Sequence, residues 1–388
     1  MSQLKVAVIG LGALGSATLL ALARQGIAVE GFEQYRVGHE FGASGGKTRQ
    51  YRLIYGEGQR YTPLLLRARA LWQQLEAEQQ RQLFWSSGFL TLGTADSPWF
   101  NAVLQSAQQQ QLPYELLSRD EINQRFPRLN VDHDEVGLFD PAGGVLLTHE
   151  LLIASVRQAE ALGAKVHERA TIRDIAENDD GVTLDIDGER RHFDRVVVTT
   201  GAWGKALLPD VALSSRRLGL TFHLPQQSGF DTAAFPATMR VSAGRPMWNT
   251  QPMPDGQSFK FFVGDAEFDE QHHPGKRAVD QSSALTPGII DRIDLHLTSA
   301  VNGAERAIVG GATYPEAYTF DQAPLLGARH AGSRVYVGLG LSGHGFKLAP
   351  SLGELLATAV TGQVDLSQEW GCFDPGREFH EPEAVYSR

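Results

Sequence analysis

The sequence predicts an α/β fold in which two domains are interleaved along the chain. Three observations predict it. A strand–helix–strand unit opens the sequence, because the apolar run 5–9 is followed by an apolar helix to about Gln25 and by a second strand over 27–32. Buried strands return in the middle, at 195–200, and near the end, at 335–341, with mixed β segments between them. A length of 388 residues also favours two domains over one.

The turn of the opening unit carries a dinucleotide-binding fingerprint. It reads Gly10-Leu11-Gly12-Ala13-Leu14-Gly15 and joins the first strand to the helix, while the second strand delivers Glu33. Gly10 makes the tight turn, Gly12 lets the backbone approach a pyrophosphate, and Gly15 lets helix and strand pack closely. Glu33 is placed to accept hydrogen bonds from ribose hydroxyls. A carboxylate disfavours a 2′-phosphate, so NADP is not expected.

The apolar stretch 6–23 also allows a signal peptide or a marginal membrane span as alternatives. The flanking positive charge is one lysine, and three glycines weaken a spanning helix. The second strand follows without a cleavage-site pattern. We therefore expect a soluble chain without a membrane span.

Composition narrows the class of protein further. A net charge of −10 and a pI near 5.7 argue against a nucleic-acid-binding surface, and 42% hydrophobic residues are enough for sizeable cores. Cys372 is the one cysteine, which excludes an intramolecular disulfide and any Cys-rich metal site and fits a reducing cytoplasm. The twelve histidines show no zinc-like spacing, so no metal is predicted.

The remaining elements follow in chain order. Ser97-Pro98 predicts the start of a surface helix that contains the Gln-rich tract 105–111, and Thr148 begins a helix that ends at Gly163. Residues 164–172 read as a strand, and 182–193 as a hairpin around Asp187-Gly188. Residues 230–268 form short β-like pieces, and a last helix runs from about 350 to 361.

Four further motifs carry a resemblance to a known family. Besides the fingerprint, they are Gly46-Lys47-Thr48-Arg49-Gln50-Tyr51-Arg52, Tyr55-Gly56-Glu57-Gly58, Thr200-Gly201-Ala202-Trp203 and Ser342-Gly343-His344-Gly345-Phe346-Lys347. With these motifs, the chain resembles the flavin-dependent amine oxidases of the D-amino-acid oxidase superfamily, in the branch of monomeric sarcosine oxidase and N-methyltryptophan oxidase, over nearly its whole length.

The resemblance implies a Rossmann-like FAD-binding domain joined to a substrate domain on a mixed sheet. The FAD-binding domain would comprise 1–83, 148–214 and 322–388, and the substrate domain 84–147 and 215–321. It changes the expected dinucleotide from NAD to FAD. The implied FAD contacts are Gly10, Gly12, Ala13, Leu14, Gly15, Glu33, Ser44, Lys47, Thr48, Arg49, Ile172, Gly201, Trp203, Gly343, His344, Gly345, Phe346 and Lys347.

The resemblance also implies catalytic roles for four cations. Arg52 and Lys347 would clamp the substrate carboxylate, which suits the bidentate donors of arginine. Arg49 would lie on the other face of the flavin, and Lys260 matches the lysine that activates dioxygen. From residue type alone, the arginines also read as solvated helix charges and Lys260 as an outward side chain of an alternating strand.

Two departures from the family concern the flavin side. Relatives attach the flavin through a cysteine seven residues before the aspartate of a Thr-x-Asp segment; here that segment is Thr319-Phe320-Asp321, and Tyr314 takes the position. We therefore expect noncovalent FAD. The active-site tyrosine of the relatives aligns with Glu316, or with Tyr314 if a gap is allowed.

Further departures rebuild the substrate pocket. The family histidine shortly before the Thr-Arg pair is replaced by Gly45, and another, four residues past the lysine, by Gly264. An aromatic pocket residue falls at Asn249, beside Trp248. The candidate substrate contacts are thus Arg52, Lys347, Trp248, Asn249, Tyr314 and Glu316, and sarcosine is not the expected substrate.

These observations predict a cytoplasmic FAD enzyme, a monomer or small homo-oligomer, that oxidises the C–N bond of a secondary or N-substituted amino acid with dioxygen as acceptor. A same-fold dehydrogenase that uses a quinone or carrier protein is the main alternative. A flavoprotein that modifies tRNA fits the acidic charge poorly. A non-catalytic flavin-binding protein finds no support in the retained Arg52 and Lys347.

Overall fold

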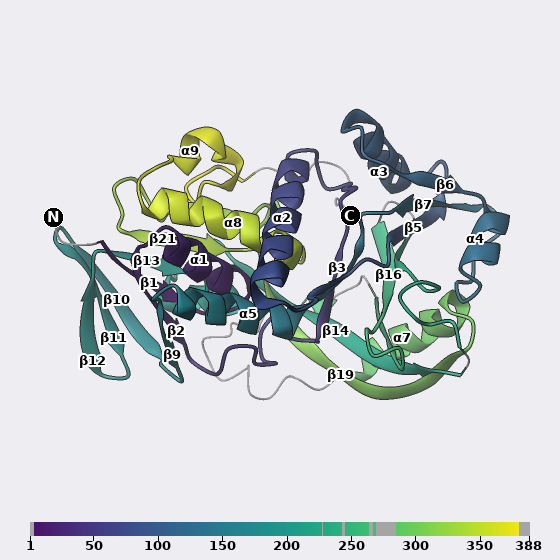
Figure 1. Ribbon diagram of the computed structural model, residues 1–388, viewed down its shortest axis with the longest axis horizontal. Helices are drawn as coiled ribbons and strands as arrows, with labels where there is room; N and C mark the ends of the chain where they lie inside the picture. The colour runs from purple at the N-terminus through teal and green to yellow at the C-terminus, as the bar shows by residue number, and fades with distance from the viewer. Residues whose placement is uncertain (1–3, 227, 243–244, 264–266, 269–284, 380–388) are drawn as a thin grey trace.

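The computed structural model describes residues 4–226, 228–242, 245–263, 267–268 and 285–379. Figure 1 shows two lobes, and the N-terminal and C-terminal helices lie together in one of them. A long antiparallel pair, β14 (Ser214–Pro225) and β19 (Ala304–Tyr318), runs along the lower edge of the second lobe toward the first. Gly264, the position of one family histidine, lies outside the described residues.

The first lobe contains a six-stranded sheet of the order β20-β21-β13-β1-β2-β9. Strands from β21 to β9 are parallel, and β20 pairs antiparallel with β21. Segments from the start, middle and end of the chain therefore share one sheet, as the interleaved pattern predicts. The strands are β1 (Lys5–Ile9), β2 (Ala28–Glu33), β9 (Lys165–Glu168), β13 (Arg195–Val198), β20 (Leu325–Ala328) and β21 (Val335–Leu339).

Both faces of this sheet are covered, which explains the continuous apolar runs of its strands. Val6 and Val8 pack in one core with the helices α1 (Ala13–Arg24), α2 (Tyr61–Gln79), α5 (Thr148–Ala161) and α8 (Gly345–Val360). Ala7 and Ile9 point to the other side and pack against the antiparallel strands β10 (Ile172–Asn178), β11 (Gly181–Ile186) and β12 (Glu189–Phe193).

The second lobe is built on a nine-stranded mixed sheet. Its path is β18-β14-β17-β16-β15-β5-β7-β6, with β19 paired to β14. Trp248, Phe259 and Phe261 form the core on one face with α4 (Arg119–Arg125) and α7 (Pro287–Ala300), and α3 (Pro98–Gln109) packs near β5. The other strands are β5 (Phe89–Thr94), β6 (Glu115–Leu117), β7 (Glu135–Asp140), β15 (Ala237–Ser242), β16 (Arg245–Pro252), β17 (Phe259–Val263) and β18 (Glu267–Phe268).

A small antiparallel sheet brings the arginine-bearing segment to the centre of the molecule. Its order is β3-β8-β4, with β3 (Thr48–Tyr51), β8 (Gly144–Leu147) and β4 (Phe84–Trp85). Tyr51 and Leu146 bury their side chains in the core of the first lobe. Short helices complete the described fold: α6 (Gly204–Leu207), α9 (Leu366–Glu369) and the 3-10 turns η1 (Gly201–Trp203) and η2 (Gly371–Phe373).

The mixed α/β architecture confirms the predicted fold class, and most elements lie where the sequence placed them. The hairpin turns at Asp187-Gly188, both with positive φ, and α3 begins at Pro98 after the N-cap Ser97. The domain boundaries at 84, 148, 215 and 322 stay a prediction. No helix in the described ranges is long and apolar enough to cross a bilayer.

Two boundaries were predicted wrongly. The last helix begins at Gly345 rather than near 350, so Pro350 lies inside α8. The segment 164–172 is two strands instead of one, because Arg169 adopts a φ of +57°. The N–H groups of Arg169 and Ala170 donate to the carbonyl groups of Tyr35 and Glu33, which turns the chain out of the sheet.

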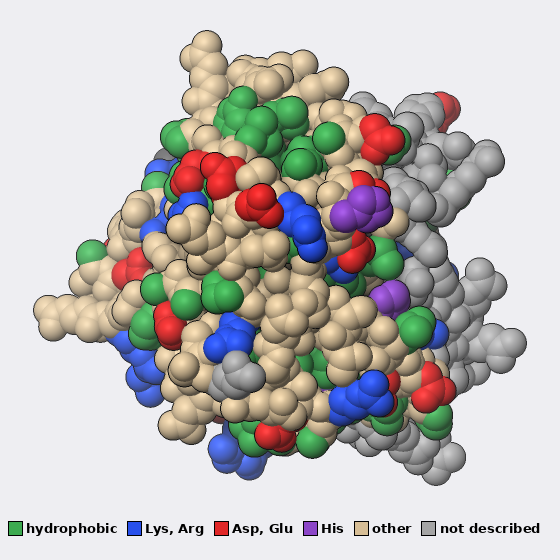
Figure 2. Space-filling model, turned by 90° about the vertical axis from the view of Figure 1, so that its right-hand side faces the viewer, with side chains coloured by type: hydrophobic (Ala, Val, Ile, Leu, Met, Phe, Trp, Pro, Cys, Tyr) green, Lys and Arg blue, Asp and Glu red, His purple; other side chains and the backbone are tan. Residues whose placement is uncertain are grey.

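The end of the molecule formed by the mixed sheet carries charges of both signs. Figure 2 shows this face, where blue Lys and Arg side chains are interspersed with red Asp and Glu side chains. Among the described side chains on this face, no single-sign patch dominates.

Candidate active site

The tight turn between β1 and α1 requires glycine at residues 10 and 15. Gly10 has a φ of +85°, and its N–H donates to the carbonyl oxygen of Phe32 at 2.8 Å. A Cβ atom on Gly15 would lie 1.8 Å from the carbonyl oxygen of Gly10 and 2.6 Å from Oγ1 of Thr199. Only glycine at residue 15 therefore lets α1 start this close to the strand.

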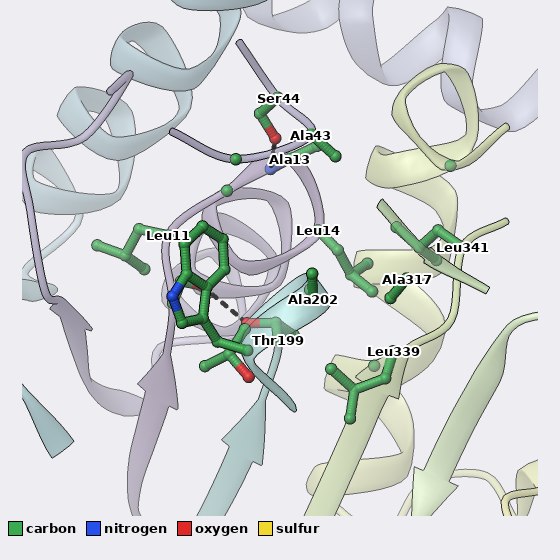
Figure 3. A pocket seen from close by; sticks show the side chains of 18 of the residues that line it. Leu11, Ala13, Leu14, Ala43, Ser44, Thr199, Ala202, Ala317, Leu339 and Leu341 are labelled. Carbon is green, nitrogen blue, oxygen red and sulfur yellow. Dashed lines mark hydrogen bonds between the residues drawn. The ribbon is translucent and has the colours of Figure 1, made fainter. Parts of the chain in front are cut away.

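The N-terminus of α1 opens into a cavity. The N-cap residue is Gly12, which has no side chain to cap the helix, and the first turn contains no acidic residue. Ser44, from the loop that crosses this end, accepts a hydrogen bond from the Ala13 N–H at 3.0 Å. Figure 3 shows the Ser44 hydroxyl directed at the Ala13 N–H, with Leu11 and Leu14 below them on opposite sides of the view. Free N–H groups and the helix dipole favour an anion here.

Glu33 stands at the end of β2, buried beside this helix start. Its Oε2 accepts the Leu11 N–H at 2.9 Å, and its Oε1 accepts the Tyr35 N–H at 3.0 Å. Burial alone would raise the pKa of Glu33, but the nearby His39, at 3.4 Å, and the two N–H donors hold the pKa below its ordinary value. The side chain is thus an ionised acceptor, and a carboxylate has lone pairs left for ligand hydroxyls.

The end of β13 forms the opposite wall. Thr199 Oγ1 donates to the carbonyl oxygens of Ile9 and Gly10, which ties the two strand ends together. Figure 3 places Thr199 and Ala202 on the side across from Ala43. Gly201 has a φ of +54°, and nothing lies within 4 Å of a Cβ built there. Among the described residues, Thr200 Oγ1 is buried without a hydrogen-bond partner.

A second helix N-terminus, that of α8, reaches the same cavity. His344 is its N-cap residue, with no capping hydrogen bond and no acid in the first turn. His344 Nε2 lies 3.0 Å from the carbonyl oxygen of Gln322, which requires the proton on Nε2. Burial and then the Lys347 charge lower the pKa of His344 to about 4, so the ring is neutral. Its Nδ1 is a buried acceptor without a partner in the described chain.

The cavity encloses about 430 Å³. Fifteen of the predicted cofactor residues line it: Gly10, Gly12, Ala13, Leu14, Glu33, Ser44, Arg49, Ile172, Gly201, Trp203, Gly343, His344, Gly345, Phe346 and Lys347. Gly15, Lys47 and Thr48 do not. Lys47 instead holds its ammonium 5.2 Å from the ring centre of Phe222, and the Thr48 hydroxyl accepts a hydrogen bond from Gln251.

A cluster around Tyr55 lies beyond one end of the cavity. Lys347 Nζ donates to Tyr55 Oη and to the His344 carbonyl oxygen, both at 3.4 Å. Arg52 stacks its guanidinium over the Tyr55 ring at 4.9 Å and forms a buried ion pair with Glu57. Lys347 lines the cavity, whereas Arg52 does not. Burial and then the Arg52 charge lower the pKa of Lys347 to about 7.

Arg49 and Lys260 meet at one backbone oxygen. Arg49 Nη1 donates to the Thr48 carbonyl at 2.8 Å, and its Nη2 to the Ala43 carbonyl at 2.6 Å. Lys260 rises from β17 and donates to the same Thr48 oxygen and, at 3.4 Å, to Gly46. Burial and then the Arg49 charge place the pKa of Lys260 well below its ordinary value. Lys260 is 1% exposed and does not line the cavity.

The two candidates for the family tyrosine position lie in different surroundings. Glu316 lines the cavity and accepts a hydrogen bond from Tyr318 at 3.2 Å. Tyr314 lies against Gly45 and donates to Glu40 at 2.9 Å, outside the cavity lining. Glu316 therefore faces the cavity and Tyr314 does not, and which of the two takes the tyrosine position of the family stays a prediction.

Trp248 and Asn249 point to opposite faces of β16. Trp248 stacks on Phe261, 5.7 Å between ring centres, inside the core of the second lobe. Asn249 pairs in register with Met239, whose sulfur contacts Arg52 Nη1 at 3.4 Å. Neither residue lines the cavity, so their substrate contacts stay a prediction.

Comparison with known proteins identifies the family of this chain. Residues 5–359 match the family described as FAD dependent oxidoreductase (DAO). The chain belongs to this family. N-methyl-L-tryptophan oxidase of Salmonella arizonae is 31% identical over 363 residues, covering 90% of this chain and 92% of the relative. Monomeric sarcosine oxidase of a Bacillus species is 29% identical over 367 residues and covers 93% of each chain.

Solved structures show the same fold. NikD, described as an unusual amino acid oxidase essential for nikkomycin biosynthesis, superposes in its open form with a TM-score of 0.84 at 21% identity, covering 98% of this chain and 100% of its own. L-proline dehydrogenase from P. horikoshii has a TM-score of 0.82 at 19% identity, covering 96% and 97%. The family and the FAD cofactor inferred from the sequence are thus confirmed.

The residues present in this flavoprotein fit FAD. Two helix N-termini without acidic residues suit a pyrophosphate and a carbonyl-rich ring, and the ionised Glu33 suits ribose hydroxyls. Because Gly201 has no side chain, FAD could approach the backbone closely at this residue. The buried polar atoms Thr200 Oγ1 and His344 Nδ1 gain possible partners from a polar ligand.

Sequence reasoning missed part of the lining. The missed lining residues include Gly338, Leu339 and Leu341, at the carboxyl end of β21. Because ligands bind beyond the carboxyl ends of parallel strands, the predicted strand 335–341 was enough to identify them as candidates. Tyr35 and His39 line the cavity from a loop without a motif, and no local pattern identifies them.

Proposed function

We propose that this FAD-dependent oxidoreductase oxidises the C–N bond of an amino acid, preferably a secondary or N-substituted one, to an imine, with dioxygen as acceptor giving hydrogen peroxide. One observation carries the proposal: Lys347 lines the cavity that fits FAD, and the ring of Tyr55 lies against both Lys347 Nζ, at 5.2 Å, and the Arg52 guanidinium, at 4.9 Å. FAD, when bound, supplies the hydride acceptor.

Arg52 and Lys347 suit recognition of the substrate carboxylate. Both cations are buried, at 9% and 8% exposure, where a charge-assisted hydrogen bond is strong. Arg52 already pairs with Glu57, but a guanidinium has five donors and keeps some for a second carboxylate. A carboxylate held between the two cations would be fixed in orientation against the cavity.

Cations around the cavity also favour the reactive form of the amine. A hydride leaves a carbon next to a neutral amine more readily than one next to an ammonium. Arg49 and Lys347 both line the cavity, and nearby positive charge lowers the pKa of an ammonium group. These side chains therefore support loss of the amine proton before oxidation.

Lys260 supports dioxygen as the acceptor. Its ammonium donates to the carbonyl oxygens of Gly46 and Thr48, and Thr48 directly precedes Arg49 in the chain. The side chain is buried away from water. Electron transfer to dioxygen develops negative charge on oxygen, and a buried cation stabilises it. A dehydrogenase of the same fold that passes electrons to a quinone or carrier protein does not need a cation to stabilise charge on dioxygen.

The proposal is tested by adding N-alkyl, cyclic and primary amino acids to the holoenzyme without oxygen and following the flavin absorbance. We expect bleaching by at least one N-substituted amino acid, and Lys347→Met should abolish it at the same concentration. Bleaching by amines that lack a carboxylate, but not by amino acids, would contradict the proposal. Bleaching without peroxide after air is admitted would select the dehydrogenase.

A further inference from the structure

Glu316 is a buried carboxylate that no cation of the described residues touches. It is 7% exposed and lines the cavity. Within the described part of the chain, Tyr318 is its one hydrogen-bond donor, at Oε2, and no Lys, Arg or His nitrogen lies within 4.0 Å of its carboxylate oxygens. Buried carboxylates are normally paired, because an isolated buried charge is costly. The arrangement therefore leaves room for a partner from outside the chain.

The three nearby cations are bonded elsewhere. Arg49 donates to the Thr48 and Ala43 carbonyls, and Lys347 to Tyr55 and His344. Arg216, opposite Glu316 on β14, holds its guanidinium 4.3 Å from the ring centre of Tyr318. These charges act on Glu316 only at longer range, and the pKa of Glu316 stays above its ordinary value because burial outweighs them.

The wall beside Glu316 is bare backbone. A Cβ atom on Gly343 would lie 2.8 Å from Tyr318 Oη and 3.4 Å from Glu316 Oε2, and its φ of +81° also favours glycine. Gly343 thus keeps the approach to the pair of Glu316 and Tyr318 free of a side chain. Tyr318 fixes Oε2, which leaves Oε1 for a ligand in the cavity.

We propose that Glu316 binds a second cationic group of the substrate, so that the enzyme acts on amino acids whose side chain or N-substituent carries an ammonium or guanidinium. The group is a second one because a carboxylate against the reacting nitrogen would stabilise its ammonium form and oppose hydride loss. That the bound substrate is oxidised depends on the proposed function. Binding of a cationic group depends only on Glu316.

Binding tests the site without any turnover. Calorimetry on the FAD-loaded enzyme compares straight-chain ω-amino carboxylates of three to six carbons with the alkanoates of equal length. We expect at least one ω-amino carboxylate to bind on the order of 10- to 100-fold more tightly than its alkanoate, as for a charged hydrogen bond. Glu316→Gln keeps the shape and should remove this advantage.

Glu305→Gln serves as the matched control, because Glu305 lies at the other end of β19 and does not line the cavity. It should keep the full advantage, and bound FAD per protein shows that both variants are folded. Equal affinity for every pair in the wild type, or an advantage that survives Glu316→Gln, would overturn the proposal. If Glu316 is protonated and uncharged, the wild type should bind each ω-amino carboxylate and its alkanoate equally well, which would overturn the proposal.

Turnover then separates the two proposals. N-methylated lysine or ornithine should show a higher kcat/KM than N-methylated norleucine or norvaline, and Glu316→Gln should remove this preference, measured as the ratio of the two kcat/KM values. Oxidation of both at equal rates overturns the role of Glu316 while the proposed function stands. Selective binding of ω-amino carboxylates without oxidation of any amino acid leaves the cation site and refutes the proposed function.

Discussion

The ring of Tyr314 occupies the space that Gly45 leaves open. A Cβ atom at residue 45 would lie 2.3 Å from Cε1 of Tyr314 and 2.8 Å from Oε2 of Glu40. The resemblance implies a histidine and a cysteine at these two positions. The hydrogen bond from Tyr314 to Glu40 ties the loop that contains Glu40 to β19.

This contact predicts a coupled loss of stability. Gly45→Ala forces its new methyl group into the Tyr314 ring and should lower the free energy of unfolding by about 1–3 kcal/mol, as for an overpacked site. The same substitution in a Tyr314→Ala background should cost much less, because the ring is gone. A double-mutant cycle from denaturant unfolding of the holoenzyme measures the difference. Equal costs in both backgrounds would show that the ring and residue 45 do not compete.

Tyr314 also predicts how FAD is retained. A tyrosine at this position cannot form the thioether of the relatives, and Cys372 does not line the cavity. Precipitation of the yellow protein with acid should release all FAD into the supernatant, where its absorbance is compared with that of the native sample. Colour that stays with the precipitate would contradict noncovalent binding.

Arg52 and Lys347 are expected to bind the carboxylate. Charged hydrogen bonds contribute about 1.5–3 kcal/mol each, so Arg52→Ala should lower kcat/KM by about one to two orders of magnitude or more. The affinity for a simple carboxylate inhibitor should fall in parallel. Because removing Arg52 leaves Glu57 unpaired, Arg52→Lys serves as the control that keeps a charge. Unchanged inhibitor affinity in both Arg52→Ala and Lys347→Ala would refute the assignment.

Carboxylate binding should depend on pH through Lys347. Its pKa is lowered to about 7, so the ammonium is present below that pH and is lost above it. A bound carboxylate prefers the charged form, and its Kd should therefore rise between pH 7 and 9, by at most about tenfold per unit. Lys347→Arg keeps its charge throughout and should flatten the profile. A Kd that is constant from pH 6 to 9 in the wild type would contradict this role.

Lys260 should accelerate reoxidation by oxygen rather than oxidation of the substrate. Lys260→Met removes the buried cation, and stopped-flow mixing of the reduced enzyme with oxygen should show about two orders of magnitude slower return of the flavin colour. Anaerobic reduction by substrate should change far less, since that step creates no anion on oxygen. Equal slowing of both steps would indicate a structural role, and no slowing of either would remove the main support for an oxidase.

The local motifs could be predicted because their chemistry is contained in a few consecutive residues. The fingerprint from Gly10 to Gly15 needs only its own strand and helix, and the segment 342–347 follows its strand directly. The late helix was placed too far along, because Pro350 resembles a helix start although α8 tolerates it in its second turn.

Contacts between distant segments could not be predicted in the same way. The face of β16 that holds Asn249 and the core position of Trp248 depend on sheet packing, which alternation alone does not assign. Lys47 and Arg49 are near neighbours in one motif, yet only Arg49 reaches the cavity, because Lys47 has a positive φ and turns toward Phe222. That Glu316 rather than Tyr314 faces the cavity likewise depends on the register of β19.

We propose that this cavity binds FAD and that the enzyme oxidises the C–N bond of an amino acid there. A single turnover of the holoenzyme tests it most directly, with substrate added without oxygen and the products counted. We expect one equivalent of imine, or of the carbonyl compound that water forms from it, per FAD reduced, followed by one equivalent of hydrogen peroxide when oxygen is admitted. A flavin that stays oxidised with every amino acid offered, or reduction with neither an imine nor a carbonyl product, would contradict this activity.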